Sequence, residues 1–192
     1  MKSTMLVGLG NPGTNYAGSY HNVGGLFVDY LASQNSCEFK KGGSFEYAKI
    51  NIENKKFVLV RPAVFMNVVG EAVIAAIKYL DAKPKNLLVV HDDSDIEIGR
   101  YKLSFGRGAA GHKGVESIIK SIGNKNFTRV RVGIREPVKS GHARPKAETF
   151  VLKNITKKNR AKLYLVFEDI KRKVIENDTL PPAEGIIEEI GS

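Results

Sequence analysis

Two periodicities of apolar residues alternate along the chain. Short apolar runs typical of strands occur at 4–9, 45–52, 56–60, 86–91, 101–105 and 129–134. Between them, apolar residues recur at helical spacing at 22–33, 69–80 and 112–122. Strands that alternate with helices in this way predict an α/β fold. We expect a single-domain three-layer sandwich with a mixed, mostly parallel twisted sheet flanked by helices.

A long basic helix is predicted toward the C-terminal end. Thr156 is a suitable N-cap, and the residues after it place one apolar stripe on the helix, made of Leu163, Val166, Phe167, Ile170 and Val174. Lysine and arginine occupy much of its polar surface. We therefore interpret residues 1–192 as one domain, in which 156–192 form a basic C-terminal helix and tail.

The composition agrees with a globular domain that has no cross-links. Of the 192 residues, 42% are hydrophobic, which is enough for a buried core, and the single cysteine, Cys37, excludes an internal disulfide. This use of cysteine fits the reducing cytoplasm. The N-terminal apolar run is broken by Gly8, Gly10 and Pro12, so we expect neither a signal peptide nor a membrane-spanning helix.

Positive charge is concentrated in one part of the chain. The formal net charge is +10, from 30 Lys and Arg against 20 Asp and Glu. Residues 100–146 contain twelve basic residues and only two acidic ones, Glu116 and Glu136, so this segment accounts for the whole excess. Such a surface favours a polyanionic partner, with nucleic acid the leading candidate, although charge kept only for solubility gives the same composition.

The loop after the first strand carries glycines at the spacing of a dinucleotide-binding fingerprint, in Gly8-Leu9-Gly10-Asn11-Pro12-Gly13. In that fingerprint the third glycine opens the helix, whereas here the loop continues to about residue 22, and no second strand ending in an acid follows at the required distance. A nucleotide-dependent oxidoreductase is therefore disfavoured. Asn11 instead offers an amide on a turn that a ligand can approach closely.

One histidine and a group of acids indicate acid–base chemistry. His21 lies late in the same loop, and the acids of His91-Asp92-Asp93-Ser94-Asp95 come directly after a predicted buried strand, at the end where α/β folds form their sites. A carboxylate that accepts an imidazole N–H fixes the tautomer of the ring and raises its basicity. The acids lack the spacing of a calcium loop and have one adjacent histidine, so no metal site is expected. A purely structural role for His21 stays open.

Several motifs together resemble the bacterial peptidyl-tRNA hydrolases, in order and in approximate spacing, over roughly residues 4–180. They are Gly8-Leu9-Gly10-Asn11-Pro12-Gly13, Tyr16, His21-Asn22-Val23-Gly24, Phe65-Met66-Asn67, His91-Asp92-Asp93-Ser94-Asp95, Gly111-His112-Lys113-Gly114 and Arg131-Val132-Gly133-Ile134. The resemblance implies a cytoplasmic enzyme that hydrolyses the ester between a peptide, or an N-blocked amino acid, and the 3′-terminal ribose of tRNA. Such an enzyme recycles tRNA from stalled or prematurely released peptidyl-tRNA.

The resemblance also implies roles for individual residues. It assigns His21 as the general base and Asp92 as the acid that orients it, with a peptide site lined by Asn11, Tyr16, Met66, Asn67 and Lys113. An imidazole with an ordinary pKa of about 6.5 can accept a proton from water at neutral pH. The amide of Asn11 or of Asn67 would stabilise the oxyanion, and the other would hold the peptide. Neither a cofactor nor a metal is required, and we expect a monomer.

The sequence departs from the family pattern at two places. Lys113 stands where the family usually has asparagine, so a cation that only donates replaces an amide that donates and accepts. In the basic clamp for the 5′ phosphate of tRNA, Arg131 matches one half, and Ser104 aligns with the lysine of the other half. Lys102 and Arg107 are candidates to compensate near the acceptor stem, because phosphate contacts need no single geometry. A non-enzymatic RNA-binding protein on the same scaffold is the alternative function.

Overall fold

The computed structural model describes residues 3–137, 146–176 and 189–190. The strands are β1 (Thr4–Gly8), β2 (Lys40–Lys41), β3 (Phe45–Ile52), β4 (Lys55–Pro62), β5 (Leu87–Glu97), β6 (Tyr101–Phe105), β7 (Thr128–Arg135) and β8 (Glu189–Ile190). The helices are α1 (Val23–Gln34), α2 (Val69–Tyr79), α3 (Lys113–Ile122) and α4 (Lys157–Ile170), the last of which continues as π-helical turns at Lys171–Glu176. None of the helices in these ranges has the length and apolar character needed to cross a membrane.

All these strands form one mixed sheet in the order β2-β3-β4-β1-β5-β7-β6-β8. The four central strands, β4, β1, β5 and β7, run parallel to one another. Antiparallel pairs flank them, with β3 on one side and β6 on the other. The carboxyl ends of the central strands therefore lie along the same edge of the sheet, where the loops that follow them can meet.

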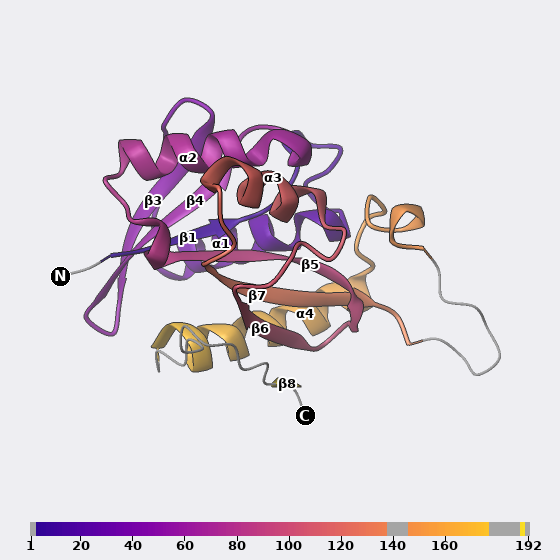
Figure 1. The fold of residues 1–192 in the computed structure, drawn as a ribbon. Coiled ribbons are helices and arrows are strands. Elements are labelled where there is room, and N and C mark those ends of the chain that lie inside the picture. Colours follow the sequence, from indigo (N-terminus) through magenta and orange to yellow (C-terminus); the bar gives the residue numbers. More distant parts are fainter. Residues whose placement is uncertain (1–2, 138–145, 177–188, 191–192) are drawn as a thin grey trace.

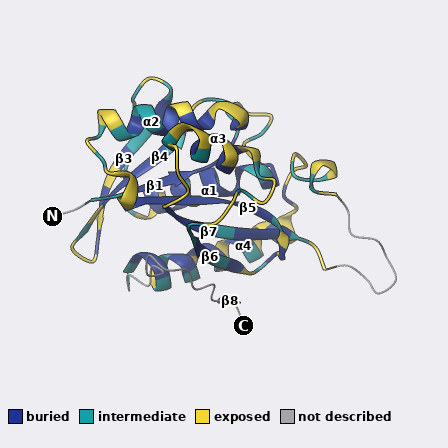
Figure 2. Cartoon of the chain, viewed as in Figure 1, coloured by how far each residue is buried: buried dark blue, intermediate teal, exposed yellow. Residues whose placement is uncertain are grey.

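Helices cover both faces of the sheet, which gives three layers (Figure 1). Successive residues of a strand point to opposite faces, so neighbouring residues enter different cores. Leu6 packs with α1 and α4 on one face, whereas Val7 packs with α2 and α3 on the other. The central strands β1, β4, β5 and β7 are largely buried, and the helices carry exposed residues on their outer surfaces (Figure 2). The expected α/β sandwich with a mixed sheet is confirmed.

The predicted elements form close to the expected positions, with one difference that concerns the acids. The sequence pattern placed Asp92 and Asp93 after the end of a strand, but β5 continues through them to Glu97. That prediction was wrong because β5 keeps pairing with β7 beyond the apolar run, with a shift in register between Asp93 and Glu97. The N-cap predicted at Thr156 is confirmed, since its side chain accepts a hydrogen bond from Asn159 N.

Gly8 at the end of β1 and Gly24 in α1 allow a close approach of the helix to the sheet. A Cβ atom on Gly8 would lie 2.2 Å from the carbonyl oxygen of Gly24, and a Cβ atom on Gly24 would lie 2.1 Å from that of Val90. The first turn of α1 thus rests directly on the backbone of β1 and β5. This contact brings the N-terminus of α1, and with it His21, to the edge of the sheet.

The close approach of α1 leads to a prediction about stability. We expect Gly24→Ala to lower the free energy of unfolding by about 3 kcal/mol or more, because the added methyl group meets rigid backbone atoms of two strands. Gly25→Ala is the matched control, since its Cβ atom would have only an ordinary 3.8 Å contact, and alanine favours a helix by about 1 kcal/mol over glycine. Urea denaturation of both variants checks this. Equal stabilities would contradict the packing argument.

Candidate active site

The loops after β1 and β4 meet Asp92 of β5 at the carboxyl edge of the sheet and bring several predicted residues together. His21 lies in a 3-10 turn, Tyr20–Asn22, just before α1. Its Nδ1–H donates to Asp92 Oδ1 over 2.9 Å, which joins two residues 71 positions apart in the sequence. The side chain of His21 is 14% exposed and that of Asp92 only 4%. The imidazole is therefore accessible to solvent on one side, and the carboxylate that it contacts is buried.

His112 belongs to the same cluster, although the sequence analysis gave it no role. Its Nε2–H donates to the oxygen that His21 also contacts, Asp92 Oδ1, again over 2.9 Å. The two imidazole rings lie 5.0 Å apart, centre to centre. The sequence signal that could have found His112 is its position directly before α3, because an N-cap residue must turn its side chain back onto the helix.

The capping role of His112 fixes its tautomer. Its Nδ1 accepts hydrogen bonds from the backbone N–H groups of Gly114 and Val115, at 3.2 and 3.3 Å. Nδ1 is therefore unprotonated, and the proton of the neutral ring is on Nε2, where it points at Asp92. Although the three side chains His21, Asp92 and His112 are close enough together to surround a metal ion, a protonated Nε2 is a donor rather than a ligand. The chemistry of this donor set does not fit a metal.

The surroundings of Asp92 keep it ionised. Burial by itself would raise the pKa of this carboxyl, but the charge and the hydrogen bonds of His112 and His21 outweigh burial and hold the pKa well below its ordinary value of 3.8. A carboxylate that accepts two imidazole N–H groups on one oxygen acts as their common anchor. It also supplies the negative charge that a protonated imidazole would need beside it.

His91 lies behind this cluster and is nearly fully buried. Its ring packs edge-on against that of His112, with the centres 4.6 Å apart, and its Nδ1–H donates to the carbonyl oxygen of Asp92 over 2.7 Å. Burial, together with the electrostatic influence of His112 and Arg129, lowers the pKa of His91 well below 6.5. The ring is therefore neutral in the folded protein.

The neutral His91 leads to a prediction about stability and pH. Unfolding exposes a ring that binds a proton with a pKa of about 6.5, so the unfolded state binds more protons than the folded state below that pH. The free energy of unfolding should fall by about 1.4 kcal/mol between pH 7.5 and 5.5 on account of His91 alone. Urea denaturation at the two pH values measures the fall, and His91→Phe should reduce it by that amount. An unchanged pH dependence in the variant would contradict the assignment.

Asn11 and Asn22 join the loop after β1 to the other parts of the site. The side chain of Asn22 holds the backbone of Asn11 from both sides, accepting from its N–H at 2.9 Å and donating to its C=O at 2.8 Å. The side-chain oxygen of Asn11 accepts from the backbone N–H of Met66 at 2.9 Å. Its oxygen is thereby occupied, and the Nδ2 group is the part of Asn11 left to face a substrate.

Three other residues expected in the peptide site are Met66, Asn67 and Tyr16. Met66 is buried, and its sulfur packs so closely over Gly114 that a Cβ atom there would lie 2.4 Å away. Asn67 is exposed at the start of the helical segment after β4. Tyr16 makes an edge-to-face contact with Phe65, which is 53% exposed. These positions are compatible with the expected roles without testing them.

Lys113 is the first residue of α3 and is exposed beside the buried part of the cluster. The partial positive charge of a helix N-terminus disfavours a cation at this position and favours an anion. The charge of Lys113 is therefore more favourable when a negatively charged ligand, such as a phosphate, is bound than it is in the free protein. The substitution of the family asparagine thus changes the charge at the rim of the site and leaves the cluster around Asp92 in place.

Basic residues lie side by side on the strands next to the site. Lys102 of β6 and Arg131 of β7 are paired across the two strands and therefore share one face of the sheet. Arg131 Nε donates to Asp93 Oδ2 at 2.7 Å, which fixes the guanidinium on β7. Asp93 follows Asp92 in β5, so the same strand holds the basic pair and the histidine cluster at a fixed separation.

Ser104 and Arg107 differ sharply in exposure. Ser104 is buried, and its hydroxyl has no hydrogen-bond partner among the described residues, so it does not reach a phosphate at the surface. It pairs across the strands with Arg129, whose Nη2 donates to the carbonyl oxygens of Arg107 and Gly108 at 3.0 Å each. Burial lowers the pKa of Arg129 to about 10. Arg129 thus holds the loop that carries the exposed Arg107.

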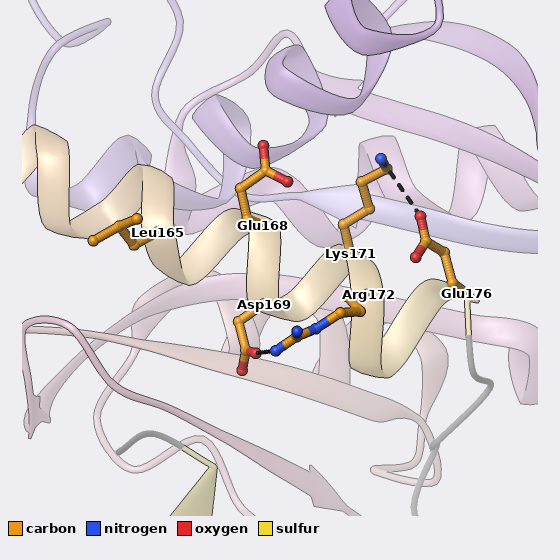
Figure 3. A pocket seen from close by; sticks show the side chains of 6 residues that line it. All are labelled: Leu165, Glu168, Asp169, Lys171, Arg172 and Glu176. Atoms are coloured by element: carbon orange, nitrogen blue, oxygen red, sulfur yellow. Dashed lines mark hydrogen bonds and ion pairs between the residues drawn. The ribbon is translucent and has the colours of Figure 1, made fainter.

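One hollow on the described surface lies away from this cluster. A pocket of about 370 Å³ is formed by α4 and the π-helical turns, as Figure 3 shows, and is lined by Leu165, Glu168, Asp169, Lys171, Arg172 and Glu176. Its charges are paired within the helix, for example Arg172 with Asp169 at 2.8 Å. The pocket shares no residue with the cluster around Asp92.

Comparisons with known proteins agree with this geometry. The sequence profile of the peptidyl-tRNA hydrolase family matches residues 5–179. Peptidyl-tRNA hydrolases from Mycobacterium tuberculosis and Mycobacterium marinum are 39% and 37% identical over 166 residues, which is 85% of this chain and 85% of each relative. The crystal structure of peptidyl-tRNA hydrolase from Acinetobacter baumannii superposes with a TM-score of 0.80 at 29% identity, covering 94% of this chain and 91% of the other.

The match extends over most of the chain and includes all the motifs that carried the resemblance. The relatives bear the name of a hydrolase, which supports the enzymatic function expected from the sequence and not the non-enzymatic alternative. The substrate class, peptidyl-tRNA, follows from the family. This chain therefore belongs to the peptidyl-tRNA hydrolase family.

Proposed function

We propose that this chain hydrolyses the ester of peptidyl-tRNA with His21 as the general base and Asp92 as its orienting acid. The observation that carries the proposal is the bond from His21 Nδ1–H to Asp92 Oδ1. Because Nδ1 carries the proton of the neutral ring, the lone pair is on Nε2 and is available to water. Nε2 removes a proton from that water as its oxygen attacks the ester carbonyl, and Asp92 stabilises the imidazolium that forms. The tetrahedral intermediate then breaks its bond to the 3′-terminal ribose oxygen, which leaves as a hydroxyl with the proton from the imidazolium.

The proposed oxyanion donor is Nδ2 of Asn11. The carbonyl carbon becomes tetrahedral when water attacks, and its oxygen then needs a fixed hydrogen-bond donor. Asn11 is such a donor because the N–H of Met66 occupies its other atom. Asn22, next to His21 in the chain, holds Asn11 by two hydrogen bonds and so sets the distance between base and donor. Asn67 is left to contact the peptide backbone, with Tyr16 and Met66 beside it.

The proposed contact with the tRNA phosphates is the pair formed by Lys102 and Arg131, with Arg107 beside it. Lys102 replaces the cation that the family has at Ser104, because it lies directly across from Arg131 on the same face. The acceptor stem would then lie along β6 and β7, and the 3′ CCA end would reach the cluster around Asp92. The pairing of Arg131 with Asp93 supports this, since a fixed guanidinium binds phosphate with less loss of side-chain entropy.

This contact predicts the salt dependence of tRNA binding. We expect Lys102→Ala and Arg131→Ala each to reduce the slope of log Kd against log salt concentration by about one unit, because each removes one phosphate contact. Lys56→Ala is the matched control, because Lys56 is exposed near the beginning of β4, away from the carboxyl ends of the central strands. Fluorescence anisotropy at several salt concentrations provides the slopes. A slope unchanged in both variants would rule out the pair as a phosphate site.

We propose that one copy of the chain is sufficient for activity, as a cytoplasmic monomer. The support is that His21, Asp92, Asn11 and the basic pair all come from the same chain and contact one another or neighbouring strands. The substrate itself, a product of interrupted translation, is formed in the cytoplasm.

The experiment that tests the function measures release of an N-acetylated amino acid from its tRNA by the purified chain, with a chelator present throughout. We expect turnover by the parent chain. Lys113→Asn, assayed alongside, should change kcat/KM by less than about tenfold, since Lys113 lies outside the hydrogen bonds of the cluster and one hydrogen bond contributes about 1 kcal/mol. If the parent chain binds the tRNA without cleaving it, and Lys113→Asn restores cleavage, the non-enzymatic alternative is correct.

A further inference from the structure

Asn159 is a fully buried amide in the first turn of α4, outside the cluster described above. Its Nδ2 group donates to Tyr20 Oη over 2.7 Å and also to the carboxylate of Glu136. Its Oδ1 atom is buried and has no hydrogen-bond partner among the described residues. An orphaned buried acceptor weakens a fold relative to an apolar side chain of the same size, so stability alone does not explain an asparagine here.

Tyr20 connects Asn159 to the site through a single short turn. In the turn Tyr20–Asn22, three successive side chains bind three different parts of the protein. Tyr20 binds Asn159 of α4, His21 binds Asp92 of β5, and Asn22 binds Asn11 after β1. A displacement of the tyrosine ring would therefore be passed to the imidazole one residue away.

The backbone of the same turn is held by the segment that leads into α4. The N–H of His21 donates to the carbonyl oxygen of Val151 at 2.8 Å, and that of Tyr20 donates to Lys153 at 3.2 Å. Both contacts lie between Glu136, where β7 has ended, and α4. The side-chain amide of Asn159 adds a third connection between these parts, because its NH2 group donates one hydrogen bond to Tyr20 and another to Glu136.

We propose that Asn159 is a positioning residue for catalysis. By holding Tyr20 and Glu136 with its two N–H groups, it fixes the turn that carries His21 relative to β7, which carries Arg131. The base and the basic strand then keep a constant separation when tRNA binds. This inference rests on the proposed role of His21 as general base, and it adds a residue that touches neither substrate nor reacting atoms.

The test compares Asn159→Leu with Tyr20→Phe in the release assay. Leucine fills the same volume and removes the orphaned acceptor together with both donors, so the fold should be retained. We expect each variant to lower kcat by about tenfold or more and to leave KM within about twofold, because the imidazole is misplaced while the tRNA contacts remain. The double variant should be no slower than Asn159→Leu alone, because both changes remove the same hydrogen bond.

A second readout reports on the position of His21 itself. In the parent chain the Nδ1–H proton of His21, held by Asp92, should give a protected downfield resonance in the NMR spectrum. We expect this resonance to shift or broaden in Asn159→Leu. Val166→Ala is the matched control, since it removes buried apolar volume from the same helix and lowers the melting temperature, yet touches none of the hydrogen bonds of Asn159. Its kcat and its histidine resonance should match those of the parent.

The outcomes separate the two proposals. If Asn159→Leu keeps the kcat and the histidine resonance of the parent, Asn159 has no positioning role, although His21 can still be the base. If kcat falls only as far as it does in Val166→Ala, the effect is one of stability and the inference is likewise wrong. If His21→Ala retains the activity of the parent, the proposed function fails first, whatever Asn159→Leu does.

Discussion

Replacing His21 by alanine is expected to lower kcat by about 100- to 10,000-fold, the range that a positioned general base contributes. The lone pair on Nε2 is the one that the imidazole of His21 offers to water, because Nδ1–H is bound to Asp92. Asp92 cannot replace the base, because its one contacted oxygen already accepts two N–H groups and its pKa is held well below 3.8. Release of N-acetylated amino acid from tRNA under saturating conditions measures kcat.

Two controls make the His21→Ala result specific. Binding of tRNA should be unchanged, since the basic pair on β6 and β7 does not contact His21, and anisotropy with an uncharged tRNA measures this. Unfolding should stay cooperative, because His21 is at the rim rather than in either core. A variant that binds tRNA normally and keeps more than about a tenth of the parent kcat would show that another group activates the water.

Replacing Asp92 by asparagine is expected to lower kcat by about 100-fold or more. His21 and His112 both donate to the same atom, Oδ1, so an asparagine oxygen can keep both contacts while the negative charge is lost. The imidazolium that forms when His21 takes the proton then has no counter-charge beside it. The variant thus separates the charge of Asp92 from its role in orientation, and the same release assay measures the loss.

Asp92→Ala is the control for Asp92→Asn, because it removes the orienting contacts as well as the charge. Alanine removes both the charge and the anchor for two imidazole rings, so we expect its kcat to fall at least as far as that of Asp92→Asn. Should Asp92→Asn instead retain nearly full activity while Asp92→Ala does not, orientation by the carboxylate would be its only function. Equal and small losses in both would remove Asp92 from the mechanism.

The two histidines that contact Asp92 have different proposed roles. His112 is fixed at Nδ1 by two backbone N–H groups and at Nε2 by Asp92, so both of its nitrogens are occupied. His21 has one nitrogen held and the other open. This difference supports His21, rather than His112, as the base, and it gives His112 the role of fixing the carboxylate that His21 depends on.

Much of the fold was determined by local sequence pattern. The apolar residues of α4 and the alternation of strands and helices predict the elements correctly because burial on one face imposes a period that is visible along the chain. The group of motifs was sufficient for the family, and the resemblance that they carry assigned roles to His21, Asp92 and Asn11. The single cysteine likewise excluded a disulfide without any structure.

Tertiary structure alone decided how these residues act together. Nothing in the sequence pattern indicated the contacts of His112 or Asn22. Only the folded structure shows that His112 and His21 donate to the same oxygen of Asp92, and that the side chain of Asn22 holds the backbone of Asn11. Only strand register places Lys102, and not Ser104, across from Arg131 at the surface. Such contacts join residues distant along the chain, and their partners depend on the register of strands and the angle of a helix, which no local period encodes.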